Sequence, residues 1–422
     1  MHSVTNAIPT GTIASIPAKA HAHRALICAA LANSPSTILL SRTSKDIDAT
    51  MESLRGLGAH VVYENKIVTV TPGPAPVKGN VVPHESGTTL RLLLPVAASI
   101  CNDVDVDAKG RLPDRPLEPM LGEMKAHGVI FSQDKPPFTM TGRLQGGNFS
   151  MVGDVSSQFF SGLLLAAPQI GLSTITSTTP LQSSDYVTLT TETMRDFGVE
   201  VEHTLPDTNI NEAFTVPFGA SFIGRDNYQI EGDWSNAAIW MVAAGMTGKP
   251  ITITGMNKNS VQADRRIMQV MIDAGCDVVW DGMNITVTGR ASKPIHADLE
   301  QMPDMLPVMA ALACSISGES SFVKGARLRL KESDRLIAVA NLVRDLGGTV
   351  REEGDDLYII GSGILKGGHG DCVNDHRLVM AGTLMALISE NPVTLQDSEA
   401  ITKSYPDFFE DWNLLGGNAQ PL

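Results

Sequence analysis

The feature that most constrains the fold of this chain is an internal repeat. Six times along its 422 residues, a segment with helical periodicity ends at a glycine and continues into a strand-like segment, at a spacing of about 70 residues. Glycine at such a position fits the left-handed backbone with which many helices end. The six glycines are Gly58, Gly128, Gly198, Gly275, Gly347 and Gly416.

A second marker precedes each of these glycines. It is a polar start followed by a run rich in Ala, Leu and Met that is apolar nearly all round, which predicts a buried helix. Between the two markers we expect a strand, such as 36–40 or 250–254, and an amphipathic helix, such as Asp46–Leu57 or Ser260–Ala274. Each unit is therefore predicted to run as strand, buried helix, strand, second helix and strand. The buried helices are predicted over Lys19–Ala32, Glu85–Ser99, Asp154–Pro168, Asp233–Met246, Asp304–Ser315 and Asp375–Ile388.

Six such units are longer than the chain that a single hydrophobic core usually supports. We therefore expect an α/β protein with two domains of about 200 residues and three units each. Each domain should pack its buried helices inside and its sheets outside, and the two lobes should face each other across a cleft. The polar helix starts would lie at comparable ends of their units. Free N–H groups and the helix dipole make such ends sites for anions.

One stretch, from Arg327 to Leu336, is unusually rich in charge. Four cationic side chains stand there beside Glu332 and Asp334, although the whole chain has a net charge of −14. Local cations in an acidic chain with 5% aromatic residues favour a small, multiply anionic ligand over nucleic acid. Taken alone, the same cluster is more often a solvated helix start with Ser333 and Asp334 as caps.

Metal, disulfide and membrane sites are not expected. The five cysteines are scattered and form no CxxC pair, and His21 and His23 lack partners with metal-ligand spacing. The longest apolar runs, such as Leu163–Pro168 and Val308–Cys314, are far shorter than a membrane span, and the N-terminus lacks the pattern of a secretion signal. We expect a soluble cytoplasmic protein without a metal.

Six motifs, each weak alone, together make the chain resemble the 5-enolpyruvylshikimate-3-phosphate synthase family over essentially its whole length. The resemblance implies a two-lobed inside-out α/β barrel of six repeats, three per lobe, that closes on its substrates. The chain would cross between lobes near Pro17 and near Glu231, giving a lobe of 1–16 plus 229–422, a second lobe of 17–228, and an active site in the cleft between them. The motifs are Pro17–Arg24, Ser86–Arg91, Arg111–Leu117, Val155–Gln158, Leu328–Leu336 and Asn374–Arg377.

The resemblance also implies a reaction, in which the enolpyruvyl group of phosphoenolpyruvate passes to the 5-hydroxyl of shikimate 3-phosphate and phosphate is released, without a cofactor. Both substrates are anions, so fixed cations in a desolvated cleft are expected. The positions matched to shikimate 3-phosphate are Lys19, Arg24, Ser156, Ser157, Gln158, Ser183, Tyr186, Asp304 and Lys331. Those matched to phosphoenolpyruvate are Lys19, Gly87, Arg115, Gln158, Arg335, Arg377 and Lys403.

Catalysis of this reaction needs acid and base groups near the enol carbon, because C3 must gain a proton on addition and lose one on elimination. The resemblance implies Asp304 as base toward the attacking hydroxyl and Glu332 as proton donor and acceptor at C3, with Lys19 assisting. Which carboxylate handles which proton stays open. Asp304 and the pair Ser156 and Ser157 also suit simple helix capping.

The chain departs from the family pattern at several positions, which leaves two alternatives open. Ala18 and Ala20 flank Lys19 where serines are usual, and Glu85 and Arg327 each stand where asparagine is frequent. A weak or non-catalytic homologue that binds the same anions is therefore an alternative. UDP-N-acetylglucosamine enolpyruvyl transferase ranks lower, because its family places a cysteine on the loop matching Lys109–Pro116 and this chain has none there. We expect a monomer that binds small anionic substrates, without nucleic-acid or membrane partners.

Overall fold

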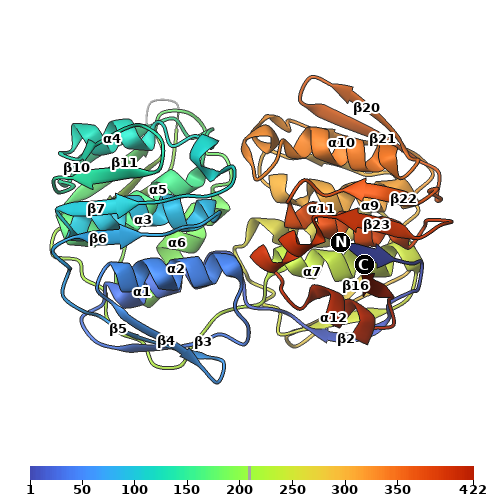
Figure 1. Ribbon diagram of the computed structural model, residues 1–422, viewed down its shortest axis with the longest axis horizontal. Coiled ribbons are helices and arrows are strands. Elements are labelled where there is room, and N and C mark those ends of the chain that lie inside the picture. Colours follow the sequence, from blue (N-terminus) through green and yellow to red (C-terminus); the bar gives the residue numbers. More distant parts are fainter. Residues whose placement is uncertain (208–210) are drawn as a thin grey trace. The chain divides into compact units, whose positions relative to one another are not determined.

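The structure, a computed structural model, describes residues 1–207 and 211–422. It divides into two compact units (Figure 1). Unit 1 contains Met1–Ile16 and Glu231–Leu422, and unit 2 contains Pro17–Ile230. Both chain termini therefore belong to unit 1.

The described residues form six four-stranded sheets that share one pairing pattern. In each sheet the first two strands run parallel, and the remaining two pairings are antiparallel. Unit 2 holds the sheets β14-β3-β5-β4, β6-β7-β9-β8 and β10-β11-β13-β12. Its strands are β3 (Ser36–Leu39), β4 (His60–Glu64), β5 (Ile67–Thr71), β6 (Gly79–Val81), β7 (Asp103–Val106), β8 (Ile130–Phe131), β9 (Phe138–Thr141), β10 (Gly147–Met151), β11 (Ser173–Ser177), β12 (Glu202–Thr204), β13 (Ala213–Val216) and β14 (Tyr228–Gln229).

Unit 1 repeats the pattern in the sheets β2-β15-β17-β16, β18-β19-β21-β20 and β22-β23-β1-β24. Two of these sheets take a strand from the start of the chain: β2 pairs parallel with β15, and β1 lies between β23 and β24. The strands are β1 (His2–Val4), β2 (Gly11–Ala14), β15 (Ile251–Thr254), β16 (Asp277–Asp281), β17 (Asn284–Thr288), β18 (His296–Asp298), β19 (Gly318–Val323), β20 (Thr349–Glu353), β21 (Asp356–Gly361), β22 (Gly368–Asp371), β23 (Val393–Gln396) and β24 (Ala419–Pro421).

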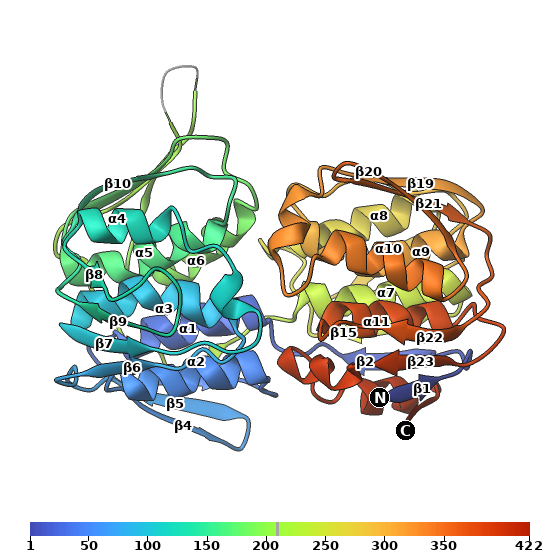
Figure 2. The same ribbon diagram turned by 45° about the horizontal axis from the view of Figure 1, so that its top comes forward.

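Within each unit the sheets lie outside and the most apolar helices lie between them (Figure 2). In unit 2 the helices are α1 (Lys19–Ala30), α2 (Lys45–Gly56), α3 (Gly87–Ile100), η1 (Leu112–Asp114), α4 (Met120–Ala126), α5 (Ser157–Ile170) and α6 (Asp185–Asp196). In unit 1 they are α7 (Trp234–Thr247), η2 (Ala263–Arg266), α8 (Ile267–Asp273), η3 (Pro303–Met305), α9 (Leu306–Ser315), η4 (Ala326–Leu330), α10 (Arg335–Asp345), α11 (His376–Ala386), η5 (Ser398–Lys403) and α12 (Phe408–Leu414).

Each unit has its own hydrophobic core. Every residue of α9 is buried, and twelve residues of α7 are buried, because these helices are apolar on all sides. The core of unit 1 joins α7, α9 and α11, and that of unit 2 joins α1, α3 and α5. At roughly 25 cal/mol per Å² of buried apolar surface, this aliphatic packing is the main favourable contribution to folding.

The glycines that end the repeats adopt the predicted backbone. All six have positive φ, from 87° at Gly347 to 103° at Gly58. At Gly58 an added Cβ would lie 2.3 Å from the carbonyl oxygen of Pro74, so both the backbone conformation and the close approach require glycine there. The left-handed helix end predicted from the sequence is confirmed at each repeat.

Some helices begin two or three residues later than predicted, because a later side chain caps them. Ser86 and Ser156 cap α3 and α5, so these helices begin after the predicted Glu85 and Asp154. The helix predicted over Ser260–Ala274 is wrong at its start, where the chain forms a loop before η2 and α8. Ser260 instead donates a hydrogen bond to Glu231.

Candidate active site

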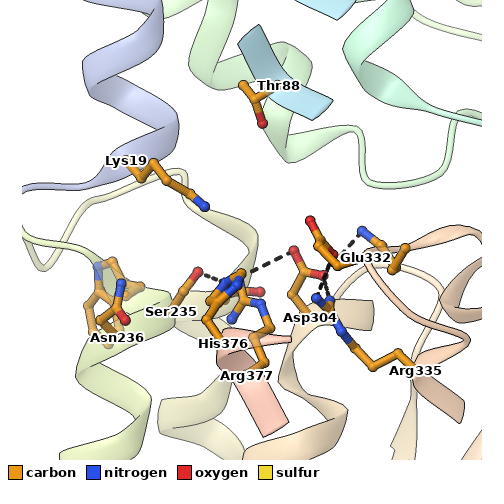
Figure 3. A network of polar contacts seen from close by, with 12 residues as sticks. Lys19, Thr88, Ser235, Asn236, Asp304, Glu332, Arg335, His376 and Arg377 are labelled. Carbon is orange, nitrogen blue, oxygen red and sulfur yellow. Dashed lines mark hydrogen bonds and ion pairs between the residues drawn. The ribbon is translucent and has the colours of Figure 1, made fainter. Parts of the chain in front are cut away.

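Arg335, at the start of α10, is the centre of a buried charge cluster in unit 1 (Figure 3). Its side chain is 1% exposed, and its guanidinium donates hydrogen bonds to three carboxylates. Nε contacts Asp375 Oδ2 at 2.9 Å, Nη1 contacts Asp304 Oδ1 at 2.7 Å, and Nη2 contacts Glu332 Oε2 at 2.6 Å. Burial lowers the pKa of Arg335, but the three carboxylates outweigh it and raise that pKa above its usual value.

Asp375 is the buried anchor of this cluster. It is the N-cap of α11, where its carboxylate accepts a hydrogen bond from the backbone N–H of Arg377. It also accepts hydrogen bonds from Arg335 and from Ser333 Oγ, the latter at 3.0 Å. The local sequence builds this contact because an aspartate before an apolar helix is a strong N-cap. One carboxylate therefore fixes the starts of both α10 and α11.

Asp304, on η3 ahead of α9, gathers the remaining cations. Its Oδ1 lies 3.1 Å from Lys331 Nζ, and its Oδ2 lies 3.4 Å from Arg377 Nη2. Burial raises the pKa of Asp304, but Lys331, Arg377 and Arg335 together hold it well below its usual value. Asp304 is therefore an ionised carboxylate when the site is empty of ligand.

The polar ends of these side chains differ in how far they reach solvent. Arg335 is 1% exposed and Asp375 is fully buried, whereas Asp304, Lys331 and Glu332 are 19%, 20% and 25% exposed. Burial lowers the pKa of Lys331 to about 8 in spite of the neighbouring Asp304. The cluster thus has two parts. The ion pair of Arg335 and Asp375 is buried, whereas Asp304, Lys331 and Glu332 are partly exposed and can contact a ligand.

Lys403, at the end of η5, lies next to the same helix start. Its Nζ donates a hydrogen bond to the carbonyl oxygen of Asn374 at 2.8 Å. The structure therefore brings together within unit 1 the sequence-predicted residues Asp304, Lys331, Glu332, Arg335, Arg377 and Lys403.

The sequence-predicted residues of unit 2 gather around the starts of α1, α3 and α5. Lys19, the first residue of α1, forms an ion pair with Asp46 at 2.7 Å. Thr89 Oγ1 donates a hydrogen bond to the Asp46 carbonyl oxygen at 3.3 Å, and the backbone N–H of Thr89 donates to Ser86 Oγ at 3.2 Å. The position of Lys19 is therefore tied to the start of α3.

Gln158 links α3 and α5. Its Oε1 accepts a hydrogen bond from Arg91 Nη1 at 3.0 Å, and its Nε2 donates to Thr88 Oγ1 at 2.9 Å. Ser156 is the N-cap of α5 and accepts from the backbone N–H of Gln158, while Ser157 is buried at the first helical position. The capping role that the sequence left open for Ser156 is confirmed, and its hydroxyl stands at a helix N-terminus that favours anions.

Gly87 is the first residue of α3 and lies against Arg115. A Cβ added at Gly87 would lie 2.5 Å from Arg115 Nη1, so any larger residue would displace that guanidinium. Gly87 stands at the N-terminus of α3, and the helix dipole favours anions at such an end. Gly87 thereby allows a cation to approach an anion-favouring helix end.

Arg24 and Ser183 are buried, and Tyr186 in α6 is half-buried. Arg24 is 1% exposed, and its guanidinium donates to Thr190 Oγ1 at 2.7 Å and to the carbonyl oxygens of Ala20 and Tyr186 at 2.7 and 3.0 Å. Ser183, just before α6, is buried with φ of +54°. The structure thus places Arg24 as a brace between α1 and α6, and its contact with a ligand stays a prediction.

Sequence reasoning did not identify Asp46 and Arg91 as partners in these clusters, nor the bonding role of Asp375. The aspartate in the motif Asn374–Arg377 had a usable signal, since it precedes an apolar helix as an N-cap does. The partners of Lys19 and Gln158 had none, because they come from other helices. No group of three or more His, Cys, Asp or Glu side chains that could hold a metal occurs among the described residues, and no helix there is long and apolar enough to cross a membrane.

Known proteins resemble this chain along nearly its whole length. The sequence profile of the family described as EPSP synthase (3-phosphoshikimate 1-carboxyvinyltransferase) matches residues 7–412. A 3-phosphoshikimate 1-carboxyvinyltransferase of Clostridium kluyveri is 36% identical over 412 residues, covering 96% of this chain and 95% of the relative. One of Methanocorpusculum labreanum is 34% identical over 417 residues, covering 97% of each.

A solved structure shares the fold. An EPSP synthase from Acinetobacter baumannii superposes with a TM-score of 0.80 at 22% sequence identity, covering 100% of this chain and 99% of the other. The predicted fold class, an inside-out α/β protein of six repeats, is confirmed by this likeness.

Proposed function

The chain belongs to the EPSP synthase family, and on that premise we propose how its own residues carry out the reaction of the family. It is a 3-phosphoshikimate 1-carboxyvinyltransferase of the shikimate pathway, which supplies aromatic amino acid biosynthesis. It transfers the enolpyruvyl group of phosphoenolpyruvate to the 5-hydroxyl of shikimate 3-phosphate and releases phosphate. The observation that carries the proposal is the cluster of Asp304, Glu332 and three cations on the matched motifs.

Phosphoenolpyruvate binds, in this proposal, at the cations of unit 1. Arg377 and Lys403 contact its charged groups, whereas the neighbouring Lys331 is matched to the acceptor. Arg335 is held by three carboxylates, so its main part is to orient Asp304 and Glu332, and a direct contact with the donor stays a prediction. Charge-assisted hydrogen bonds in a desolvated site contribute about 1.5–3 kcal/mol each.

Two carboxylates of unit 1 carry the proton transfers. Asp304 is ionised, as its lowered pKa requires, and it can accept the proton of the attacking 5-hydroxyl. Glu332 is the most exposed of the three carboxylates around Arg335, and in this proposal it exchanges protons with C3 of the donor. Addition places a proton on C3 and a bond between O5 and C2. Elimination then removes a proton from C3 and expels phosphate.

The residues of unit 2 bind the acceptor and complete the donor site. Ser156, Ser157 and Gln158 present hydroxyl, amide and helix N–H groups to the phosphate of shikimate 3-phosphate, with Arg24, Ser183 and Tyr186 supporting them. Lys19 meets both substrates. Gly87 and Arg115 add an anion site for the donor.

We propose that the two units act on one pair of substrates, because the matched residues are divided between them. Cations on both units would repel each other when no ligand is present, and the anionic acceptor supplies the interaction that favours closure. The protein would act in the cytoplasm as a monomer. The five cysteines are free and buried, as in proteins of reducing compartments.

The departures from the family pattern affect affinity more than the type of reaction. Ala20 lacks the hydroxyl that serine would offer to the acceptor, which costs about 1.5–3 kcal/mol if nothing replaces it. A non-catalytic homologue is not favoured, because binding alone does not require Glu332.

The proposal is tested by phosphate release from phosphoenolpyruvate, measured with and without shikimate 3-phosphate in the presence of a chelator. We expect release only when the acceptor is present, and no effect of the chelator. Release that requires a divalent ion, or that proceeds with UDP-N-acetylglucosamine in place of shikimate 3-phosphate, would contradict the proposal.

A further inference from the structure

One buried carboxyl group next to the unit 1 cluster has no part in the reaction as described above. Asp264, on η2, is 1% exposed. One of its oxygens accepts a hydrogen bond from Ser235 Oγ, on the first turn of α7, which Figure 3 shows facing the cluster. The other oxygen, Oδ1, is buried without a hydrogen-bond partner among the described residues. A buried carboxylate oxygen without a hydrogen bond lowers the stability of the folded protein, which suggests that this group has a function in the site.

The charges around Asp264 come from three other elements. Arg377 at the start of α11 attracts its negative charge, whereas Asp304 on η3 and Asp233, the N-cap of α7, repel it. On its own element, Arg265 and Arg266 direct Nη1 to backbone carbonyl oxygens, those of Ser260 and Ala263.

The ion pairs of the unit 1 cluster form without this group. The cations Lys331, Arg335 and Arg377 are matched by Asp304, Glu332 and Asp375. Asp264 is a fourth carboxyl beside this cluster, and its ionised form adds a negative charge close to where an anionic ligand is to bind.

The protonation of Asp264 is poised near neutral pH. Burial raises its pKa to about 6, while Arg377 opposes this rise and Asp304 adds to it. A further negative charge placed near Arg377 would raise the pKa again.

We propose that Asp264 is a positioning residue that exchanges its negative charge for that of phosphoenolpyruvate at Arg377. Ionised Asp264 steadies the Arg377 guanidinium in the empty site. When an anionic group of the donor takes over Arg377, the Asp264 carboxylate binds one proton from solvent and becomes a neutral acid. This inference rests on the proposed function, in which Arg377 contacts the donor.

Proton uptake on binding follows from this exchange. Donor affinity should fall as pH rises above about 6, by up to tenfold for each unit by which donor binding raises the pKa of Asp264. The phosphate group of the donor itself titrates near pH 6, so a single pH profile cannot separate the two groups. Comparing the parent with a variant that lacks the Asp264 charge does separate them, because the titration of the donor phosphate is the same in both proteins.

The experiment compares the parent with Asp264→Asn, which keeps a polar side chain of the same shape opposite Ser235. Asp273→Asn is the matched control, since Asp273 is an exposed carboxylate on the adjacent α8 and accepts only from Gln269. Calorimetry of phosphoenolpyruvate binding in the presence of shikimate 3-phosphate, in buffers of different ionisation enthalpy, gives the number of protons taken up. KM and kcat at pH 6 and pH 8 give the kinetic counterpart.

We expect the parent and Asp273→Asn to take up more protons than Asp264→Asn at pH 7. The rise in the KM for phosphoenolpyruvate from pH 6 to pH 8 should be on the order of tenfold larger in the parent than in Asp264→Asn, with kcat changed far less. Equal proton uptake and equal KM ratios in the parent and Asp264→Asn would overturn the inference. A purely structural role would lower kcat and stability without changing the pH dependence of KM, and that result would overturn it as well.

A second variant protects the test against a misfolded Asp264→Asn. Ser235→Ala removes the hydrogen bond that lowers the pKa of Asp264, so the pH at which donor affinity falls should move upward. An unmoved midpoint in Ser235→Ala would also overturn the inference. Acceptor-dependent turnover by the parent is scored separately: its absence contradicts the proposed function, whereas an active parent without the pH difference contradicts only the role of Asp264.

Discussion

Replacing Arg335 with methionine should destabilise unit 1 more than any single surface change. Arg335→Met keeps most of the volume of the side chain but removes its charge and its hydrogen bonds. Asp375 would then be fully buried without its cation, and Asp304 and Glu332 would each lose a contact of 2.7 and 2.6 Å. The three carboxylates would then repel one another without the cation that they share.

The expected loss is about 3–5 kcal/mol at pH 7.5, the usual cost of removing one partner from a buried ion pair. The loss should shrink in acid. Arg335 helps to lower the pKa of Asp304, and a lowered carboxylate pKa contributes stability that is present above the unfolded-state value and lost as pH falls below it. The difference between parent and variant should therefore be largest near neutral pH and smaller below about pH 4.

Denaturant unfolding followed by tryptophan fluorescence measures this loss, because all four tryptophans, Trp234, Trp240, Trp280 and Trp412, lie in unit 1. The matched control is Arg344→Met, on the same α10, whose arginine forms an exposed ion pair with Glu352 at 2.6 Å. That control should cost no more than about 1 kcal/mol. Equal losses in the two variants would refute the reasoning that Arg335 is the buried centre of the cluster.

Three further predictions follow from the clusters. Arg377→Ala and Lys403→Ala should each raise the KM for phosphoenolpyruvate at least tenfold more than the KM for shikimate 3-phosphate, since each loses a charge-assisted contact of about 1.5–3 kcal/mol; steady-state kinetics with equal losses for both substrates would contradict this. Asp264→Asn should stabilise unit 1 by up to about 3 kcal/mol at pH 8 and have little effect at pH 4, because a carboxyl pKa raised in the folded state destabilises only where the group is ionised; unfolding curves with the same shift at both pH values would show otherwise. Shikimate 3-phosphate should compact the protein in small-angle scattering and raise the affinity for phosphoenolpyruvate by about 1–3 kcal/mol, and an unchanged radius of gyration at saturation would exclude the closure proposed here.

The repeat made most of the fold predictable from the sequence. Positive φ at Gly58 and its five counterparts, and the apolar helices between them, depend on local chemistry that a sequence displays directly. The pairing order shared by the six sheets could not be predicted from local sequence, because strands such as β1 and β14 pair with partners far away in the chain. Helix starts were misplaced where capping by Ser86 or Ser156 selected a later residue.

The types of side chain in the candidate site could be predicted from the sequence, but most of their contacts could not. The charged stretch around Lys331 and Arg335 indicated an anion site, and the structure gathers it with Asp304 and Arg377. The roles of Asp46 and Asp264 are set by contacts between different helices, which periodicity and motifs do not record. The burial of Arg24 was not predicted either, because it depends on contacts with residues of α6 that are far away in the chain.

The central claim is that Glu332 and Asp304 move protons to and from C3 and O5 during enolpyruvyl transfer. The most direct measurement is turnover of phosphoenolpyruvate and shikimate 3-phosphate in deuterium oxide, with NMR detection of the vinyl group of the product. The account predicts deuterium in that vinyl group for the parent. It predicts loss of turnover and of deuterium exchange in Glu332→Gln, with substrate binding retained in calorimetry. A parent product free of deuterium, or a Glu332→Gln enzyme that incorporates deuterium at the parent rate, would contradict the account.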